Sequence, residues 1–325
     1  MARLVPEGLD TLPAAEPADA TTVEAGTTAA PPRGASSLVW LVRALRPKQW
    51  AKNVLIFAAP GAAHVLNHGH ALGRTAVAFG AFCLLSSGTY LLNDVRDLES
   101  DRRHPTKRHR PIAAGHVGEG VALTVGVVLI AASLTAGALL RIEFLIVMLV
   151  YLGITVAYTL WLKHEPILDI VAIASGFILR AVAGGVAVDV PLSRWFLIVT
   201  SFGSLFMVSG KRHGEHIDLG DDRADVRSTL GVYSRNYLQY VWTMTSGVTV
   251  AAYCLWAFAM APKNASVPLY ELSIVPFVTF ILRYAMLLEQ GHGESPEDLV
   301  LGDRMLMALA VIWIAVFGSG VYFLH

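Results

Sequence analysis

The chain has 325 residues, of which 54% are hydrophobic and only 15% are charged, and its formal net charge is zero. Soluble domains carry about 25% charged residues, so the composition excludes an ordinary soluble globule and indicates an integral membrane protein. Zero net charge gives no indication of a nucleic-acid partner, and none is expected.

The N-terminal segment divides into two parts. Residues 1–37 are rich in Ala, Thr, Pro and Glu and lack a basic start followed by a hydrophobic core, which predicts a disordered cytoplasmic tail and no signal peptide. Residues 38–53, LVWLVRALRPKQWAKN, mix apolar and basic side chains as a helix in the membrane interface does. At its end, Lys48, Lys52 and Asn53 either bind a lipid phosphate or lie among lipid headgroups.

Apolar stretches follow that are suited to crossing a bilayer, which takes about 20 residues. They predict an all-α polytopic membrane protein with nine transmembrane helices. The expected spans are roughly 53–66, 75–92, 118–139, 143–162, 166–188, 194–210, 238–260, 269–289 and 304–324. Cys83 and Cys254 fall inside spans, so we expect buried thiols and no disulfide.

The positive charges favour one side of the membrane. Most of the 25 Lys and Arg residues lie in the N-terminal segment or in loops on its side, whereas the opposite loops hold Arg74, Arg141, Arg194 and Lys263. The positive-inside rule places the first side in the cytoplasm. Its loops are the longest, so we expect the chemistry there.

The second predicted span ends in a dense cluster of charges, NDVRDLESDRRHP, residues 93–105. Asn93, Asp97 and Asp101 recur every four residues and Asp94 precedes Asp97 by three, so a continuous helix would align them along one face. Like charges at that spacing repel each other. A divalent cation with oxygen ligands would relieve the repulsion.

Charge alone leaves two interpretations of this cluster open. In the first, it is a solvated loop whose acids pair with Arg96, Arg102 and Arg103. In the second, the basic run in DRRHPTKRHRPIAAG completes a site for a magnesium diphosphate, with acids for the metal and cations for the phosphate oxygens. The candidate phosphate ligands are Arg102, His104, Lys107 and Arg110.

The pattern NDxxDxxxD, followed by RPIAAG, resembles the first aspartate-rich motif of the UbiA superfamily of membrane prenyltransferases. The resemblance covers nearly the whole chain from about residue 43. It implies a UbiA-like transmembrane catalytic domain over 38–325, with helices around a central cavity that opens to the cytoplasm and laterally to lipid. It also implies that Mg²⁺, or Mn²⁺, holds a diphosphate there. The implied metal ligands are Asn93, Asp94, Asp97 and Asp101.

The end of the sixth predicted span departs from the superfamily pattern. A second motif, commonly DxxxD, is replaced by SGKRHGEHIDLGDD at 209–222, in which Lys211 and Arg212 precede a lone Glu215. Together with YTLWLKHEPILD, which contains Tyr158, Lys163 and Asp169, this sequence resembles an actinobacterial branch whose lipid substrate is the acceptor.

The resemblance to this branch implies magnesium-dependent transfer of 5-phosphoribose from phosphoribosyl pyrophosphate to decaprenyl or another polyprenyl phosphate. Pyrophosphate is released, and the product supplies arabinan precursors for the cell wall. A homotrimer in the plasma membrane, with its active site facing the cytoplasm, is also implied. The implied catalytic residues are Asp94, Asp97, Asp101, Asp169 and Lys211; the implied substrate ligands include Asn93, Tyr158, Lys163, Arg212 and Glu215.

Several alternatives stay open. Asp169 follows Pro166 and could favour only the helix dipole, and Tyr158 could be an interfacial aromatic residue. Arg180 within the fifth span could reach the acceptor phosphate or pair with a carboxylate such as Asp169. The alternative functions are an aromatic prenyltransferase of the same fold, which the replaced second motif disfavours, and a lipid carrier or flippase, which needs no metal cluster.

Overall fold

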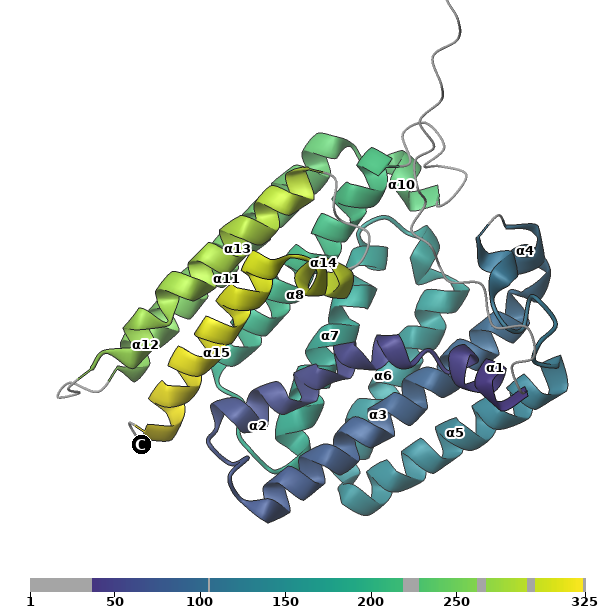
Figure 1. Ribbon diagram of the computed structural model, residues 1–325, viewed down its shortest axis with the longest axis horizontal. Helices are drawn as coiled ribbons and strands as arrows, with labels where there is room; N and C mark the ends of the chain where they lie inside the picture. The colour runs from purple at the N-terminus through teal and green to yellow at the C-terminus, as the bar shows by residue number, and fades with distance from the viewer. Residues whose placement is uncertain (1–36, 105, 219–227, 262–266, 291–295, 324–325) are drawn as a thin grey trace, which may run out of the picture. The chain divides into compact units, whose positions relative to one another are not determined.

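The computed structural model describes residues 37–104, 106–218, 228–261, 267–290 and 296–323. These residues form helices and contain no strand, so the predicted all-α class is confirmed (Figure 1). The tail predicted at 1–37 lies outside them, apart from Ser37.

The N-terminal half contains α1 (Ser37–Ala44), η1 (Pro47–Phe57), α2 (Ala58–Ala62), α3 (Gly69–Arg96), α4 (Leu98–Arg103), η2 (Lys107–His109), α5 (Glu119–Leu140), α6 (Ile142–Leu160) and η3 (Leu162–His164). The C-terminal half contains α7 (Leu168–Ala187), α8 (Arg194–Asp218), α10 (Ser228–Val232), α11 (Arg235–Met260), α12 (Leu269–Leu272), α13 (Ile274–Glu289), α14 (Pro296–Gly302) and α15 (Arg304–Phe323).

Seven helical segments of the described residues are long and apolar enough to cross a membrane, so the predicted count of nine is not confirmed. They are α3, α5, α6, α7, α11, α12 together with α13, and α15. The first predicted span, 53–66, is divided between the 3₁₀-helix η1 and the short α2. The sixth predicted span lies in α8. This helix has 25 residues and is long enough to cross a membrane, but it is too polar to count among the seven apolar segments.

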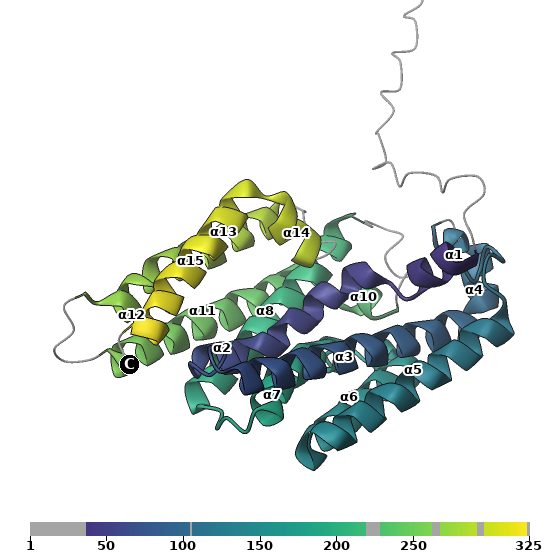
Figure 2. The same cartoon turned by 60° about the horizontal axis from the view of Figure 1, so that its bottom comes forward.

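Helices α3 and α7 are the most enclosed of the seven. In the apolar 18-residue stretch of each helix, 61% of α3 and 56% of α7 is buried inside the protein. The corresponding share is 17% in α5 and in α15. Helix α3 packs against α5 and η1, and α7 packs against α6 and α8 (Figures 1 and 2). The outer helices leave apolar side chains such as Val128 and Ile146 exposed, as contact with lipid requires.

Glycines permit two close approaches between these segments. A Cβ atom at Gly184 would lie 1.8 Å from the carbonyl oxygen of Ile56, and one at Gly88 would lie 2.8 Å from that of Gly126. The backbone of η1 therefore rests directly on α7, and α3 rests on α5. Gly184 and Gly88 are therefore packing residues.

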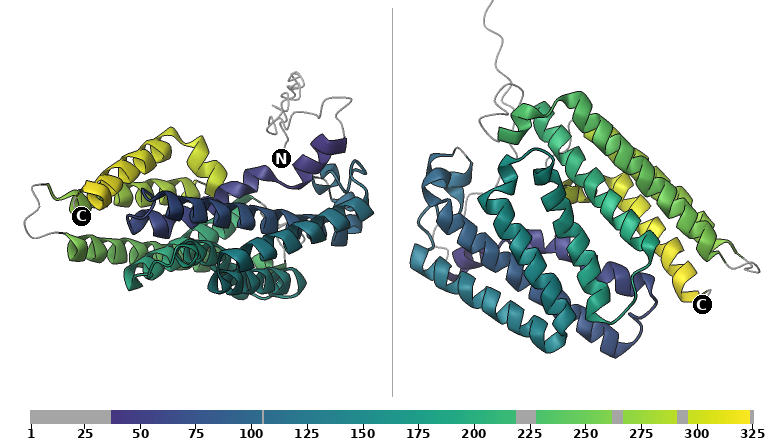
Figure 3. Two further views of the ribbon diagram at one scale, coloured as in Figure 1. Left: turned by 90° about the horizontal axis from the view of Figure 1, so that it is seen from below. Right: turned by 180° about the vertical axis from the view of Figure 1, so that it is seen from behind.

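The C-terminal helices are joined by aromatic packing. Helix α8 runs beside α11, and α13 contacts α15 (Figure 3). The ring of Tyr253 on α11 stacks on Phe277 of α13 at 4.0 Å. The hydroxyl of Tyr253 accepts a hydrogen bond of 2.7 Å from the indole Nε1 of Trp313 on α15. The hydroxyl thus ties α11 to α15 while its ring packs against α13.

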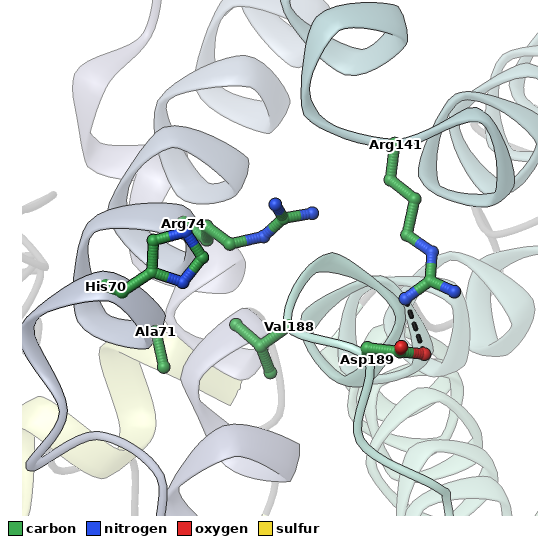
Figure 4. A pocket seen from close by; sticks show the side chains of 6 residues that line it. All are labelled: His70, Ala71, Arg74, Arg141, Val188 and Asp189. Atoms are coloured by element: carbon green, nitrogen blue, oxygen red, sulfur yellow. Dashed lines mark ion pairs between the residues drawn. The ribbon is translucent and has the colours of Figure 1, made fainter.

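An arginine near the start of α3 braces the ends of two other helices. The Nε atom of Arg74 donates to the carbonyl oxygen of Ala187 at 2.7 Å, and its Nη2 atom donates to that of Leu140 at 2.8 Å. These are the last residues of α7 and α5, whose carbonyls lack partners within the helix. Arg141 lies across a surface pocket from Arg74 and pairs with Asp189 (Figure 4).

The brace also fixes the direction of the helices. Arg74 and Asp94 are separated by about 30 Å of helix, which matches the hydrocarbon thickness of a bilayer. Because Arg74 joins the beginning of α3 to the end of α7, these two helices run antiparallel. The end of α3 and the beginning of α7 therefore lie toward the same side of the membrane.

We expect Arg74→Ala to lower the stability of the protein more than Arg141→Ala does. Two carbonyl oxygens would lose a charge-assisted hydrogen bond, each worth about 1.5–3 kcal/mol. Arg141 pairs instead with two exposed carboxylates, those of Glu143 and Asp189, and exposed ion pairs contribute little. The measurement is the unfolding temperature of each purified variant in detergent. Equal decreases for the two variants would contradict the role given to Arg74.

Candidate active site

The first acidic cluster lies where α3 gives way to α4. Asp94 is 3% exposed and Asp101 is 2% exposed. The Nη1 atom of Arg110 lies 2.6 Å from Oδ2 of Asp101 and 3.1 Å from Oδ1 of Asp94. The Nη2 atom of Arg46 lies 2.6 Å from the same oxygen of Asp94. Two arginines from different segments thus neutralise the two buried carboxylates.

Sequence separation explains why Arg46 was not predicted. It precedes Asp94 by 48 residues and adopts a left-handed conformation, φ 55° and ψ 59°, between α1 and η1. That conformation costs a non-glycine residue about 1–2 kcal/mol. Its guanidinium lies 4.8 Å from the ring centroid of Tyr90, where it gains a cation–π contact.

Of the three arginines that the loop interpretation paired with the acids, two contact backbone carbonyl oxygens and one, Arg103, pairs with an acid of the cluster. Arg96 donates to the carbonyl oxygen of Thr159 at 3.3 Å, and Arg102 donates to that of Ala113 at 3.4 Å. Arg103 pairs with Glu99 on the surface at 3.5 Å.

The predicted alignment of the acids on one helix is partly wrong. Helix α3 ends at Arg96 and α4 begins at Leu98, with Asp97 between them at φ −90° and ψ 10°. Asp94 and Asp101 still share a side and meet at Arg110. Asp97 is half-buried and lines a surface hollow instead.

The structure permits a test of the predicted metal site. No group of three or more His, Cys, Asp or Glu side chains in the described ranges is arranged to hold a metal ion, and arginines stand at the two buried carboxylates. However, Oδ2 of Asp94 is buried without a hydrogen-bond partner in the described part of the chain, which fits a ligand position. Mg²⁺ keeps several waters and binds through one or two carboxylates plus substrate phosphates. Asp94 and Asp101 therefore fit a site shared with a diphosphate.

The second cluster centres on Asp169 in the first turn of α7. Asp169 is fully buried, and its Oδ2 atom accepts a hydrogen bond from Nε of Arg212 on α8 at 3.0 Å. Its Oδ1 atom accepts from the hydroxyl of Tyr233, which lies just before α11. The Nη1 atom of Arg212 lies 2.6 Å from Oε2 of Glu215. Asp169 does more than favour the helix dipole, because it joins three segments.

Tyr233 holds the start of α7 in place. Burial, together with the hydrogen bond to Asp169, raises the pKa of the Tyr233 hydroxyl, so this group stays protonated and donates. The same hydroxyl accepts from the backbone N–H of Ile167. Ile167 has φ 70°, which is rare for a β-branched residue and marks local strain.

Lys211 and Arg212 are neighbours in sequence but differ in environment. The side chain of Lys211 is 33% exposed, and its Nζ atom lies 3.8 Å from Oε1 of Glu215. The side chain of Arg212 is 1% exposed, and its Nη2 atom has no hydrogen-bond partner among the described residues. Lys211 is therefore accessible to a ligand, whereas Arg212 is held inside the fold.

Arg180 has neutral partners. Its Nε atom donates to Oδ1 of Asn53 at 2.7 Å, and its Nη2 atom donates to the hydroxyl of Tyr151 at 2.8 Å. The suggested pair with Asp169 is not made, because about 16 Å of helix separates the two residues. Asn53 is fully buried and also donates to Sγ of Cys83, so it joins η1 to α7 and α3.

The remaining predicted residues lie at the ends of these helices. Lys48 is exposed, and Nζ of Lys52 donates to Oε1 of Gln49 at 2.6 Å. The Nδ1 atom of His104 accepts from the backbone N–H of Lys107, whose side chain is exposed. Half-buried positions are found for Asn93, Tyr158 and Lys163.

The fold and the paired clusters define a polytopic helical membrane protein with its charged groups gathered at the ends of its most enclosed helices. The UbiA prenyltransferase family matches residues 54–310. The chain belongs to this family, and the predicted membership is confirmed.

Relatives and solved structures agree with this assignment. The chain is 43% identical over 311 residues to decaprenyl-phosphate phosphoribosyltransferase of Mycolicibacterium smegmatis, covering 92% of this chain and 97% of the relative. It is 44% identical over 293 residues to the protein of the same name in Mycobacterium tuberculosis, covering 89% and 96%. A UbiA homologue from Archaeoglobus fulgidus bound to GPP and Mg²⁺ superposes with a TM-score of 0.65 at 18% identity, covering 87% of this chain and 99% of that one. This last similarity concerns the fold.

We expect Arg212→Gln to destabilise the protein strongly. The change leaves the buried carboxylate of Asp169 without its cation, and such a loss costs about 3–5 kcal/mol. The double variant Asp169→Asn/Arg212→Gln should recover part of the lost stability, because both charges are then removed. Lys211→Gln is the matched control and should unfold near the wild-type temperature. Unfolding of Arg212→Gln at that same temperature would show that the pair contributes little.

Proposed function

We propose that the protein transfers 5-phosphoribose from phosphoribosyl pyrophosphate to a polyprenyl phosphate such as decaprenyl phosphate. The observation that carries this proposal is the end of α8, where an accessible Lys211 stands next to the buried Arg212 and Glu215 in place of an acidic pair. A prenyl diphosphate has phosphate at one end only. The ribosyl donor has a diphosphate and a separate 5-phosphate, and therefore needs a cationic site in addition to a metal site.

The two clusters divide the donor between them. Asp94 and Asp101 would hold Mg²⁺, with Asp97 beside them, and Arg110 would bind oxygens of the diphosphate. When bound, Mg²⁺ neutralises charge on the leaving pyrophosphate. Lys211 contacts the 5-phosphate. Asp169 and Arg212 position α8 and so fix the place of Lys211.

The reaction forms one bond and breaks one. An oxygen of the lipid phosphate bonds to the anomeric carbon of the ribose, and the bond from that carbon to pyrophosphate breaks, with its electron pair leaving on pyrophosphate. A phosphate monoester with a second pKa near 6 is largely dianionic at neutral pH, so no general base is required. Positioning and charge stabilisation supply the catalysis. Lys48 and Lys52 are the proposed contacts for the lipid phosphate.

The site would face the cytoplasm, where the positive-inside rule places most of the basic residues. We propose the plasma membrane as the location and arabinan precursor synthesis for the cell wall as the use of the product. Residues 38–325 form the proposed catalytic domain. Assembly as a homotrimer stays a prediction.

The second candidate function is aromatic prenyl transfer. It is favoured by the shared fold of the Archaeoglobus fulgidus homologue that binds GPP and Mg²⁺. The two functions are separated by incubating reconstituted protein either with labelled phosphoribosyl pyrophosphate and polyprenyl phosphate, or with a prenyl diphosphate and an aromatic acid. Labelled phosphoribosyl lipid in the first mixture supports the proposal, and product in the second mixture alone contradicts it.

We expect chelation of divalent metal to abolish turnover. Asp97→Asn should lower kcat least, because Asp97 lines a surface hollow, whereas Asp94→Asn and Asp101→Asn should each lower kcat by about 10²–10³-fold. That is the usual effect of removing one group that stabilises charge in a transition state. Glu99→Gln is the matched control, because Glu99 belongs to the same stretch and its side chain is 85% exposed. Near-normal rates in all three aspartate variants would refute the metal assignment.

Lys211→Ala should raise the KM for phosphoribosyl pyrophosphate by roughly ten- to a hundredfold, since one charge-assisted hydrogen bond contributes about 1.5–3 kcal/mol. The KM for polyprenyl phosphate should change little. Lys48→Ala is the paired variant and should show the opposite pattern. Initial rates measured while each substrate is varied decide between the two, and an unchanged KM for the donor in Lys211→Ala would exclude Lys211 from the donor site.

A further inference from the structure

We propose that Arg46 and Arg110 are exchangeable counter-ions, which pair with Asp94 and Asp101 in the empty site and with donor phosphate in the loaded site. The exchange would make binding of the divalent metal and binding of the donor mutually dependent. This inference rests on the proposed function and adds Arg46 to the residues that bind the donor.

The contacts at the two carboxylates suggest the exchange. Oδ1 of Asp94 lies near two guanidinium groups, at 2.6 Å from Arg46 and 3.1 Å from Arg110. Oδ2 of the same carboxylate is buried, and none of the residues that the structure describes forms a hydrogen bond with it. Arg110 also contacts Asp101 at 2.6 Å. A cation placed between Asp94 and Asp101 would meet the guanidinium of Arg110 at the same oxygens, and like charges there would repel each other strongly.

The two arginines can move, in contrast to Arg212 of the second cluster. The side chain of Arg46 is 28% exposed and that of Arg110 is 29% exposed, whereas Arg212 is 1% exposed. While it is paired with Asp94, the guanidinium of Arg46 also lies over the ring of Tyr90, at 4.8 Å from the ring centroid. Arg110 follows the surface segment η2 and reaches the cluster from its solvent side.

The displaced guanidinium groups need an anion, and the diphosphate of the donor provides it. Metal alone would leave two arginines without partners. If the donor bound alone, its phosphates would be repelled by the two carboxylates, and the two arginines would still be paired with those carboxylates. Each ligand therefore removes the obstacle to the other. Coupling between two ligands is reciprocal and typically amounts to 5–150-fold in affinity.

The experiment measures Mn²⁺ binding to detergent-solubilised protein by electron paramagnetic resonance of the free ion, with and without phosphoribosyl pyrophosphate and without lipid. In wild type we expect weak binding of Mn²⁺ alone. Arg110→Gln and Arg46→Gln should bind Mn²⁺ alone at least fivefold more tightly, because the carboxylates are vacated. Both variants should bind the donor more weakly than wild type. Arg103→Gln is the matched control and should match wild type, because Arg103 pairs with the exposed Glu99.

The coupling is measured by comparing each variant with wild type in how much the donor increases the affinity for Mn²⁺. Chelation of Mn²⁺ by the donor in solution is the same in every sample, so it cancels when the donor-induced gain in a variant is compared with that in wild type. Monodisperse elution of at least one of the two variants shows that it is folded, and either variant alone tests the proposal.

The exchange is supported if Arg110→Gln or Arg46→Gln binds Mn²⁺ alone more tightly than wild type does and if the donor then increases its affinity for Mn²⁺ by less than in wild type. Binding of Mn²⁺ alone that is equal to or weaker than that of wild type in the folded variants overturns it. If wild type makes the phosphoribosyl lipid but the variants bind Mn²⁺ as wild type does, the exchange fails and the proposed function stands. If wild type does not bind the donor at all, the proposed function fails first.

Discussion

The contact of Arg110 with both Asp94 and Asp101 is the interaction on which the first half of the site depends. The two carboxylates are almost fully buried, at 3% and 2% exposed, and burying carboxylates is costly unless a cation pairs with them. Arg110 supplies this cation from a surface segment, and Arg46 supplies a second cation from the segment before η1. The ends of α3, α4 and the segment before η1 are thereby held together at the place where a metal and a diphosphate would bind.

The second cluster uses the same chemistry for a different purpose. Arg212 is enclosed between Asp169 and Glu215. Removing the charge of Arg212 or of Asp169 would leave the other buried charge without its partner. This cluster is a permanent joint between α7 and α8, and it carries Lys211 on its accessible side. The first cluster is partly open to solvent and can change partners. Rigid and exchangeable ion pairs thus lie toward the same side of α3 and α7, opposite the brace formed by Arg74.

Residue patterns predicted much of this arrangement. Apolar runs located all seven helical segments that are suited to crossing a membrane, and the NDxxDxxxD pattern located the acidic cluster, because both are local properties of the chain. Contacts between distant segments were beyond reach: Arg46 lies 48 residues from Asp94, and Asn53, expected to bind substrate, meets Arg180 from 127 residues away. Lys211 and Arg212 looked equivalent, but successive helical residues point about 100° apart, so one faces inward. The count of nine spans was not confirmed because a 3₁₀ segment and the polar α8 do not show the ordinary apolar helical pattern.

The central claim is that ion pairs in the first cluster separate when the site is loaded. A structure of the protein with Mn²⁺ and phosphoribosyl pyrophosphate, at a resolution that shows side chains and with the metal located by its anomalous signal, tests it most directly. The account predicts Mn²⁺ bound to Asp94 and Asp101, with the guanidinium groups of Arg46 and Arg110 on phosphate oxygens. A structure in which Mn²⁺ and the donor are bound while Arg110 stays 2.6 Å from Asp101 and Arg46 stays 2.6 Å from Asp94 would contradict it.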